Sequence, residues 1–251
     1  MKIYILESLR INDPKTGEMI HNDLTHKGFN NEFNLFKTKK KLFSILTKIK
    51  NDILKNNSQP VIHFDCHGDN EGICVINGKN EVLITWEELR IKFRELQIAS
   101  GSRTVICMSS CEGLNVAKLV AAKEPCPYEF VCGSMEEIRF DLSLNAYIKY
   151  YDSIFSGKSF FDSAVDVSNM DDFKELKFIG VSSSKLFDLA VKGYIEFNCT
   201  PTLLASRKQK IINQLLSENK LNDEKRKIID EEYTLEAQKS KIMQYSSVFF
   251  S

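Results

Sequence analysis

The chain has 251 residues, enough for one domain with a full core and an appendage. Its formal net charge is zero, which gives no reason to expect nucleic acid or an anionic membrane as a partner. The apolar runs are strand-sized, far short of the ~20 residues that a membrane-spanning helix needs.

The chain contains seven cysteines, an odd number, and several of them fall in predicted strands. The first residues, Met1–Leu6, lack the apolar stretch and small-residue cleavage site of a signal peptide and read as a strand instead. We therefore expect reduced cysteines and a cytoplasmic protein.

The first 65 residues predict two strands separated by a loop and a helix. Lys2–Leu6 and Val61–Asp65 are apolar and strand-like, whereas residues 10–34 are polar and predict a long loop. Helical spacing in a lysine-rich segment predicts an amphipathic helix of about five turns, carried by Leu42, Leu46, Ile49 and Ile53.

A hairpin is predicted next, because Asn77-Gly78 is a turn signal between the apolar runs Gly72–Ile76 and Val82–Ile84. Thr85-Trp-Glu-Glu88 has the pattern of a capping box and predicts the start of a helix. Strands and helices then alternate, with strands at Thr104–Met108, Glu129–Cys132 and Lys177–Val181, and helices at Leu114–Ala122, Asp141–Phe155, Ser159–Val167 and from Ser184.

This alternation predicts an α/β fold with a largely parallel sheet. Residues 200–251 differ, because apolar residues sit among many charges without strand patterning. Thr200-Pro201 has the pattern of a helix start, and two helices broken near Asn222 are predicted. We divide the chain into a domain of residues 1–199 and a C-terminal helical extension of residues 200–251, which either packs on the sheet or has a regulatory, partner-binding role.

Two predicted strands end at reactive residues followed by glycine. Val61–Asp65 leads into His67-Gly68, and Thr104–Met108 leads into Cys111 and Gly113. Catalytic groups lie at the carboxyl ends of parallel strands, so a Cys–His dyad is expected if these strands are neighbours. Cys111 would be the nucleophile and His67 the base, with the amides of Gly68 and Cys111 as an oxyanion hole.

Zinc binding is the alternative for His63 and His67, which lie four residues apart. The segment predicts a strand rather than the helix that a zinc-binding His pair of this spacing needs, and no Cys-x-x-Cys motif supplies further ligands. We predict no metal and no cofactor. A structural histidine and an inert buried cysteine remain the alternative when each residue is taken singly.

The segment His67-Gly-Asp-Asn-Glu-Gly-Ile73 resembles the His-Gly loop of caspases, and Ser109-Ser-Cys-Glu-Gly113 resembles the loop that carries their nucleophile. Their surroundings are similar to the bacterial caspase-like CHAT domains, over roughly residues 2–198: His63, Leu83–Leu89, Ala146–Tyr151, Ile154–Ser159 and Ala164.

The resemblance implies a caspase-like three-layer α/β/α sandwich and hydrolysis of peptide bonds, with His67 as base and Cys111 as nucleophile. Caspases mature by cleavage of a linker that is short here, about Lys123–Pro127. We therefore expect a single-chain enzyme gated by a small molecule or a protein partner. Family analogy also suggests a bacterial stress or antiphage effector.

The resemblance further places Ser109 in the substrate pocket, bordered by the strand that leads into Ser134 and Glu136. The nearby acids weakly favour a basic residue at P1, although solvated rim charges are as good an interpretation: Asp69, Glu112, Glu136 and Glu137. A catalytically inactive binding or scaffold module of the same fold, and another α/β hydrolase or acyltransferase with this dyad, are the competing functional hypotheses.

Overall fold

The computed structural model describes residues 1–120 and 124–250, which contacts divide into two compact units, mainly residues 1–183 and 184–250. The division falls after Ser183, the first residue of the sixth α-helix, whereas the boundary predicted from the sequence is at residue 200. The first unit contains β1 Lys2–Ser8, α1 Thr16–His26, β2 Asn31–Leu35, α2 Lys39–Asn56, β3 Pro60–Cys66, β4 Gly72–Asn77, β5 Asn80–Thr85, α3 Trp86–Ala99, β6 Val105–Ser109, the 3-10 helices η1 Gly113–Leu119 and η2 Asp171–Leu176, β7 Phe130–Ser134, α4 Phe140–Phe155, α5 Phe160–Asn169 and β8 Phe178–Ser182.

The central sheet has six strands in the order β2-β1-β3-β6-β7-β8. The strands from β2 to β7 pair in parallel, and β8 is antiparallel to β7. The prediction of an α/β fold with a mostly parallel sheet is confirmed. Strands β4 and β5 form the predicted hairpin as a separate antiparallel pair.

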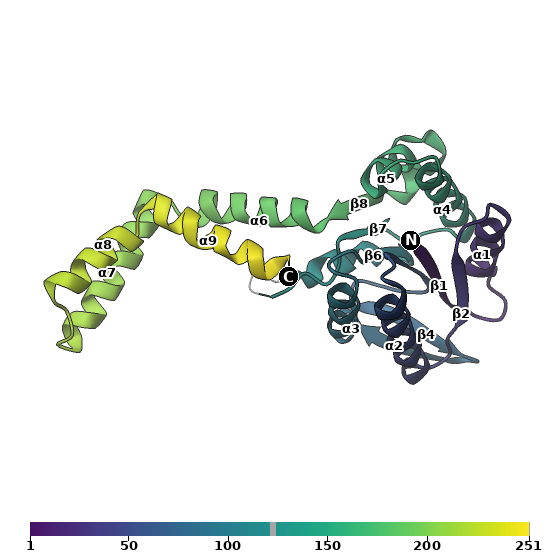
Figure 1. Ribbon diagram of the computed structural model, residues 1–251, viewed down its shortest axis with the longest axis horizontal. Helices are drawn as coiled ribbons and strands as arrows, with labels where there is room; N and C mark the ends of the chain where they lie inside the picture. Colours follow the sequence, from purple (N-terminus) through teal and green to yellow (C-terminus); the bar gives the residue numbers. More distant parts are fainter. Residues whose placement is uncertain (121–123, 251) are drawn as a thin grey trace. The chain divides into compact units, whose positions relative to one another are not determined.

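Helices cover both faces of the sheet, as is compatible with a three-layer sandwich (Figure 1). On one face, α1, α4 and α5 contribute to a core that includes Val61 of β3. On the other face, Phe64 packs edge-to-face on Phe93 of α3 with ring centroids 5.7 Å apart. Strand β3 is buried along its whole length and carries apolar residues on both faces rather than in strict alternation with polar ones.

The predicted loop of residues 10–34 is wrong, because this segment contains α1 and the edge strand β2. The apolar side chains that α1 buries are Ile20 and Leu24, one turn apart. Strand β2 is only partly buried, so polar residues are tolerated there. Both elements are therefore held by tertiary packing, which a weak local pattern does not reveal.

The second unit is helical and consists mainly of α6 Ser183–Asn198, α7 Pro201–Ser217, α8 Asp223–Glu232 and α9 Leu235–Phe249. Thr200 caps α7 as predicted, with proline in the first turn, and Asn222 caps α8. The prediction of two tail helices missed the break at Thr234, whose side chain caps α9. Among the described residues, no helix is long and apolar enough to span a membrane.

The capping box at the start of α3 is present, with the Thr85 hydroxyl accepting from the Glu88 amide and Glu88 accepting from the Thr85 amide. Thr85→Ala removes one of these bonds, and we expect it to lower the free energy of unfolding by ~1 kcal/mol, measured by urea denaturation. Thr47→Ala is the matched control, because Thr47 is exposed and its hydroxyl bonds the Phe43 carbonyl within α2. Equal stability of the two variants would contradict the capping role.

Candidate active site

The ends of β3 and β6 lie side by side, as the sequence analysis expected. The two strands are parallel neighbours, with Asp65 opposite Ser109. His67 and Cys111 each follow two positions later, so both leave the same edge of the sheet. Strand β1 pairs with β3 on its other side, with Ser8 opposite Cys66. The loop after β1 therefore starts at the same edge.

That loop supplies a side chain that the sequence analysis did not single out. The Nε2 atom of His67 lies 2.8 Å from Oδ2 of Asp13, and the edge of the imidazole packs against Phe140 of α4 with ring centroids 5.8 Å apart. Nη1 of Arg10 lies 3.2 Å from the same Nε2 atom, while the Arg10 guanidinium is paired with Glu81. His67 is thus held by groups from two other segments.

These contacts set the tautomer of His67. A carboxylate only accepts hydrogen bonds and a guanidinium only donates them, so Nε2 cannot satisfy Asp13 and Arg10 in the same state. The Asp13 contact is the shorter, and Arg10 already has a carboxylate partner in Glu81. We therefore assign the Nε2 proton to the bond with Asp13, which leaves Nδ1 with a free lone pair and able to act as a base.

The pKa of Asp13 is consistent with this role. Partial burial raises the pKa, but the hydrogen bond from His67 and the backbone amide of Arg10 outweigh it, so that the pKa lies below its ordinary value. Asp13 is accordingly ionised at neutral pH, as an acceptor for the His67 proton must be. This arrangement resembles that of the third member of a hydrolytic triad, an ionised carboxylate that accepts a hydrogen bond from an imidazole.

Cys111 is half-buried at the start of the loop after β6. Its sulfur accepts a hydrogen bond from the backbone amide of Ile138, at 3.4 Å. Glu112 has a left-handed backbone with φ of 51°, and its amide donates to the Glu136 carbonyl at 3.0 Å. Two backbone bonds therefore fix the cysteine loop against the segment that follows β7.

Gly68 allows the histidine loop to approach the cysteine loop closely. A Cβ atom at this position would lie 3.2 Å from Cβ of Ser110 and 3.3 Å from the carbonyl oxygen of Cys111. Such contacts are tighter than side chains normally make, so glycine relieves a crowded junction between the two loops. The amides of Gly68 and Cys111 remain the predicted oxyanion-hole donors.

The residues predicted to line the substrate pocket are engaged within the fold. Ser109 is buried, and its hydroxyl donates to Asp65 and contacts Ser143. Ser134 is also buried and donates to the carbonyls of Glu136 and Leu176. These hydroxyls are therefore used to join strand ends to neighbouring segments, which gives the pocket prediction no further support.

The nearby acids do not converge on a common pocket. Glu136 forms an ion pair with Lys177, and Asp69 accepts from the amides of Glu71 and Gly72 in its own turn. Glu112 is within 3.4 Å of the Asn115 amide group, and Glu137 is exposed. This arrangement favours the interpretation of these acids as rim charges and local caps. Arg10 adds a positive charge beside His67. These contacts therefore give no reason to expect a basic residue at P1.

Two buried carboxylates anchor the first turn of α1 at this edge. Asp65 at the end of β3 accepts from the Thr16 hydroxyl at 2.7 Å, and Glu7 at the end of β1 accepts from the Glu18 amide at 3.2 Å. The backbone amide of Gly17 acts against the rise in pKa that burial causes in both carboxyl groups. Unsatisfied amides at a helix start attract carboxylates, so this contact fixes where the preceding loop, and with it Asp13, must lie.

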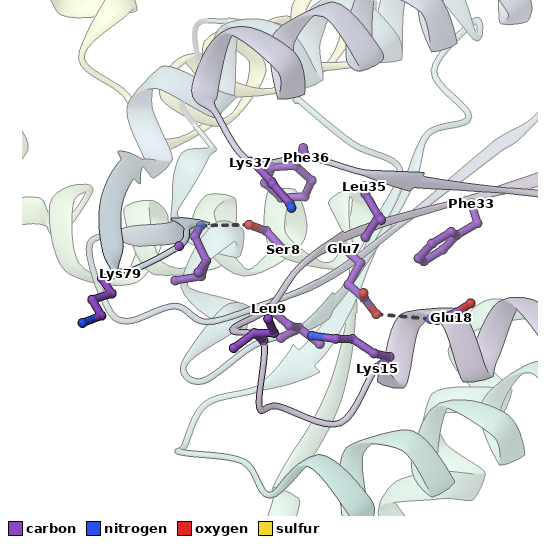
Figure 2. Close-up of a pocket in the computed structure, with 13 residues that line it drawn as sticks. Glu7, Ser8, Leu9, Lys15, Glu18, Phe33, Leu35, Phe36, Lys37 and Lys79 are labelled. Carbon is purple, nitrogen blue, oxygen red and sulfur yellow. Dashed lines mark hydrogen bonds between the residues drawn. The ribbon is translucent and has the colours of Figure 1, made fainter.

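A pocket of about 500 Å³ opens at the carboxyl ends of β1 and β2 (Figure 2). Leu9, Ile11 and Lys15 in its wall come from the loop that carries Arg10 and Asp13. The pocket is large enough for a side chain or a small molecule. Its other lining residues are Glu7, Ser8, Glu18, Phe33, Leu35, Phe36, Lys37, Ile76, Gly78 and Lys79.

His63 is separate from this chemistry. It is completely buried, its Nδ1 atom lies 2.9 Å from the Tyr151 hydroxyl, and its ring packs edge-to-face on Tyr147. Burial lowers its pKa to about 3, so the imidazole is neutral. Within residues 1–120 and 124–250, no group of three or more His, Cys, Asp or Glu side chains is arranged to hold a metal ion.

Comparison with known proteins yields no match, either to a family model or to a curated protein sequence. Any assignment of chemistry therefore depends on the residues and geometry described above.

Burial, and secondly the charge of Glu7, raise the pKa of Asp65 from 3.8 to about 7. The folded chain then holds a proton on Asp65 that the unfolded chain releases between these two pKa values. The contribution of Asp65 to the free energy of unfolding is therefore greatest below pH ~4, and it is lost as the pH rises through ~7. Asp65→Asn should lose less stability than the unchanged chain between pH 5 and pH 8, as measured by urea denaturation.

Asp141→Asn is the control for this pH profile. Its ion pair with Arg139 lowers the pKa of Asp141, so that this group does not titrate between pH 5 and pH 8. The control should follow the unchanged chain across this range. An Asp65→Asn profile parallel to both would show that Asp65 does not carry the buried proton.

Proposed function

We propose that the chain is a cysteine endopeptidase of the caspase-like clan, with Cys111 as nucleophile and His67 as general base. The observation that carries the proposal is the pairing of β3 with β6, because it brings residues 67 and 111 to one edge of the sheet. The hydrogen bond between His67 and Asp13 supports the same assignment. The resemblance of both loops to those of caspases and CHAT domains extends it to a caspase-like fold.

The proposed reaction begins with transfer of the Cys111 proton to Nδ1 of His67. The thiolate attacks the scissile carbonyl of a protein or peptide, and the amides of Gly68 and Cys111 stabilise the oxyanion, each by roughly 3 kcal/mol. The imidazolium then protonates the leaving amine, releasing it and leaving an acyl-enzyme. Water activated by His67 hydrolyses this thioester, and Asp13 holds the imidazole in one orientation throughout.

The reactivity of Cys111 tests this proposal even if the resting enzyme is gated. We expect iodoacetamide at pH 7 to alkylate Cys111 faster than Cys74, the other half-buried thiol, because a paired base increases the thiolate fraction. His67→Ala and Asp13→Asn should each slow this step by at least about tenfold. Peptide mapping by mass spectrometry gives the rate at each cysteine.

Cys74→Ala serves as the control and should leave the Cys111 rate unchanged. Burial raises the pKa of the Cys74 thiol, which lies in the β4–β5 hairpin. If His67→Ala leaves the alkylation rate of Cys111 unchanged, the two residues do not form a dyad. The scaffold hypothesis would then be preferred.

Peptide cleavage is the second requirement, and a peptide library with the activated enzyme measures it. Cys111→Ala should abolish turnover, whereas Cys74→Ala should retain it. Hydrolysis of small esters without any peptide cleavage would contradict the endopeptidase assignment and favour another α/β hydrolase. The residue preference at P1 follows from the same library.

The enzyme is proposed to act as a single cytoplasmic chain, gated by a ligand or partner and serving in bacterial stress or antiphage defence. Lys123 of the linker Lys123–Pro127 lies outside the described residues. The Pro125 carbonyl accepts from Arg94 of α3 at 3.0 Å, which ties the rest of the linker to the fold. Intact-mass measurement of the active enzyme should give one uncut chain, and an active form cut between residues 123 and 127 would contradict this.

A further inference from the structure

The helical unit contains a pocket of its own, with a volume of about 390 Å³. Helices α6, α7 and α9 and the residue after α8 contribute to its wall. This volume is within the range of small-molecule sites, roughly 300–1,000 Å³. The lining residues are Tyr194, Arg207, Tyr233, Gln238, Lys241, Ile242 and Tyr245.

The charged side chains in this wall, Arg207 and Lys241, are both cationic. Over residues 1–120 and 124–250, neither forms an ion pair with a carboxylate. Their neighbour Lys208, by contrast, is paired with Asp230 at 2.6 Å. The positive charge of the pocket is therefore available to an anionic ligand.

Neutral groups hold Arg207 in place without cancelling its charge. Its guanidinium donates to the Tyr194 hydroxyl and to Oδ1 of Asn198, each at 3.4 Å. The Tyr194 hydroxyl in turn donates to Gln238, at 3.3 Å. A guanidinium oriented in this way is suited to bidentate binding of a phosphate, and the ammonium of Lys241 adds a second positive charge.

The rest of the wall is suited to a flat ring. Three tyrosines and Ile242 line the pocket beside the two cations. Aromatic side chains stack on planar heterocycles, and sites for nucleobases combine such stacking with cationic contacts to phosphate. Ionised phosphate and an aromatic ring occur together in nucleotides.

We propose that this pocket binds a phosphorylated ligand with a planar ring, of the nucleotide class. The ring lies among the tyrosines, and the phosphates are bound by Arg207 and Lys241. This site is distinct from the residues of the proposed peptidase, and binding can be measured whether or not the chain cleaves peptides.

Isothermal titration calorimetry of the full chain tests the proposal, with ATP, GTP, CTP and UTP as separate probes. At least one should bind saturably. The corresponding nucleoside and inorganic pyrophosphate should each bind at least about tenfold more weakly, because each lacks half of the required contacts. Arg207→Ala and Lys241→Ala should each weaken nucleotide binding by a similar factor.

Lys239→Ala is the matched control, because it removes the same charge from the same helix at an exposed position outside the pocket. It should bind like the unchanged chain. Lys241 is itself exposed, so its variant is informative even if Arg207→Ala fails to fold. The proposal is overturned if no nucleotide binds, if pyrophosphate binds as tightly as the nucleotide, or if Lys241→Ala behaves like Lys239→Ala.

Discussion

The first turn of α1 is held by the buried carboxyl groups of Glu7 and Asp65, and the rest of the candidate site depends on this contact. Glu7 and Asp65 end neighbouring strands and lie opposite each other in the sheet. A Cβ atom on Gly17 would lie 3.0 Å from an oxygen of each, so the helix can approach them only without a side chain there. The short loop before α1 is thereby fixed at both ends, and Asp13 within it reaches His67.

Asp65 also links this anchor to β6, the strand that leads into Cys111. Asp65 accepts from Ser109 at the end of β6, and Ser109 in turn contacts Ser143 of α4. The ends of β3 and β6, the first turn of α1 and α4 thus share one buried polar network, from which the three loops start or to which they lead. Such a network specifies a unique arrangement when all its members are satisfied, which is what a site built from three separate loops requires.

The strands that end at His67 and Cys111 could be predicted from the sequence, because apolar runs bounded by glycine give a strong local signal. Asp13 and α1 could not, because residues 10–34 are polar and α1 buries only a few side chains. The available signal was positional: Asp13 follows the first strand closely and precedes Pro14, in a loop at the carboxyl-end edge of a parallel sheet. The pocket of the helical unit was also missed, because its residues are scattered over four segments.

The proposed chemistry depends most directly on Asp13, which would hold His67 as a base for Cys111. The ¹⁵N NMR spectrum of the full chain with labelled histidine measures this directly, and the signal of His67 is identified by its loss in His67→Ala. At neutral pH we expect His67 to carry a proton on Nε2, and we expect this preference to be lost in Asp13→Asn. A neutral His67 that carries its proton on Nδ1 alone would contradict this, because Nε2 could then not donate to Asp13.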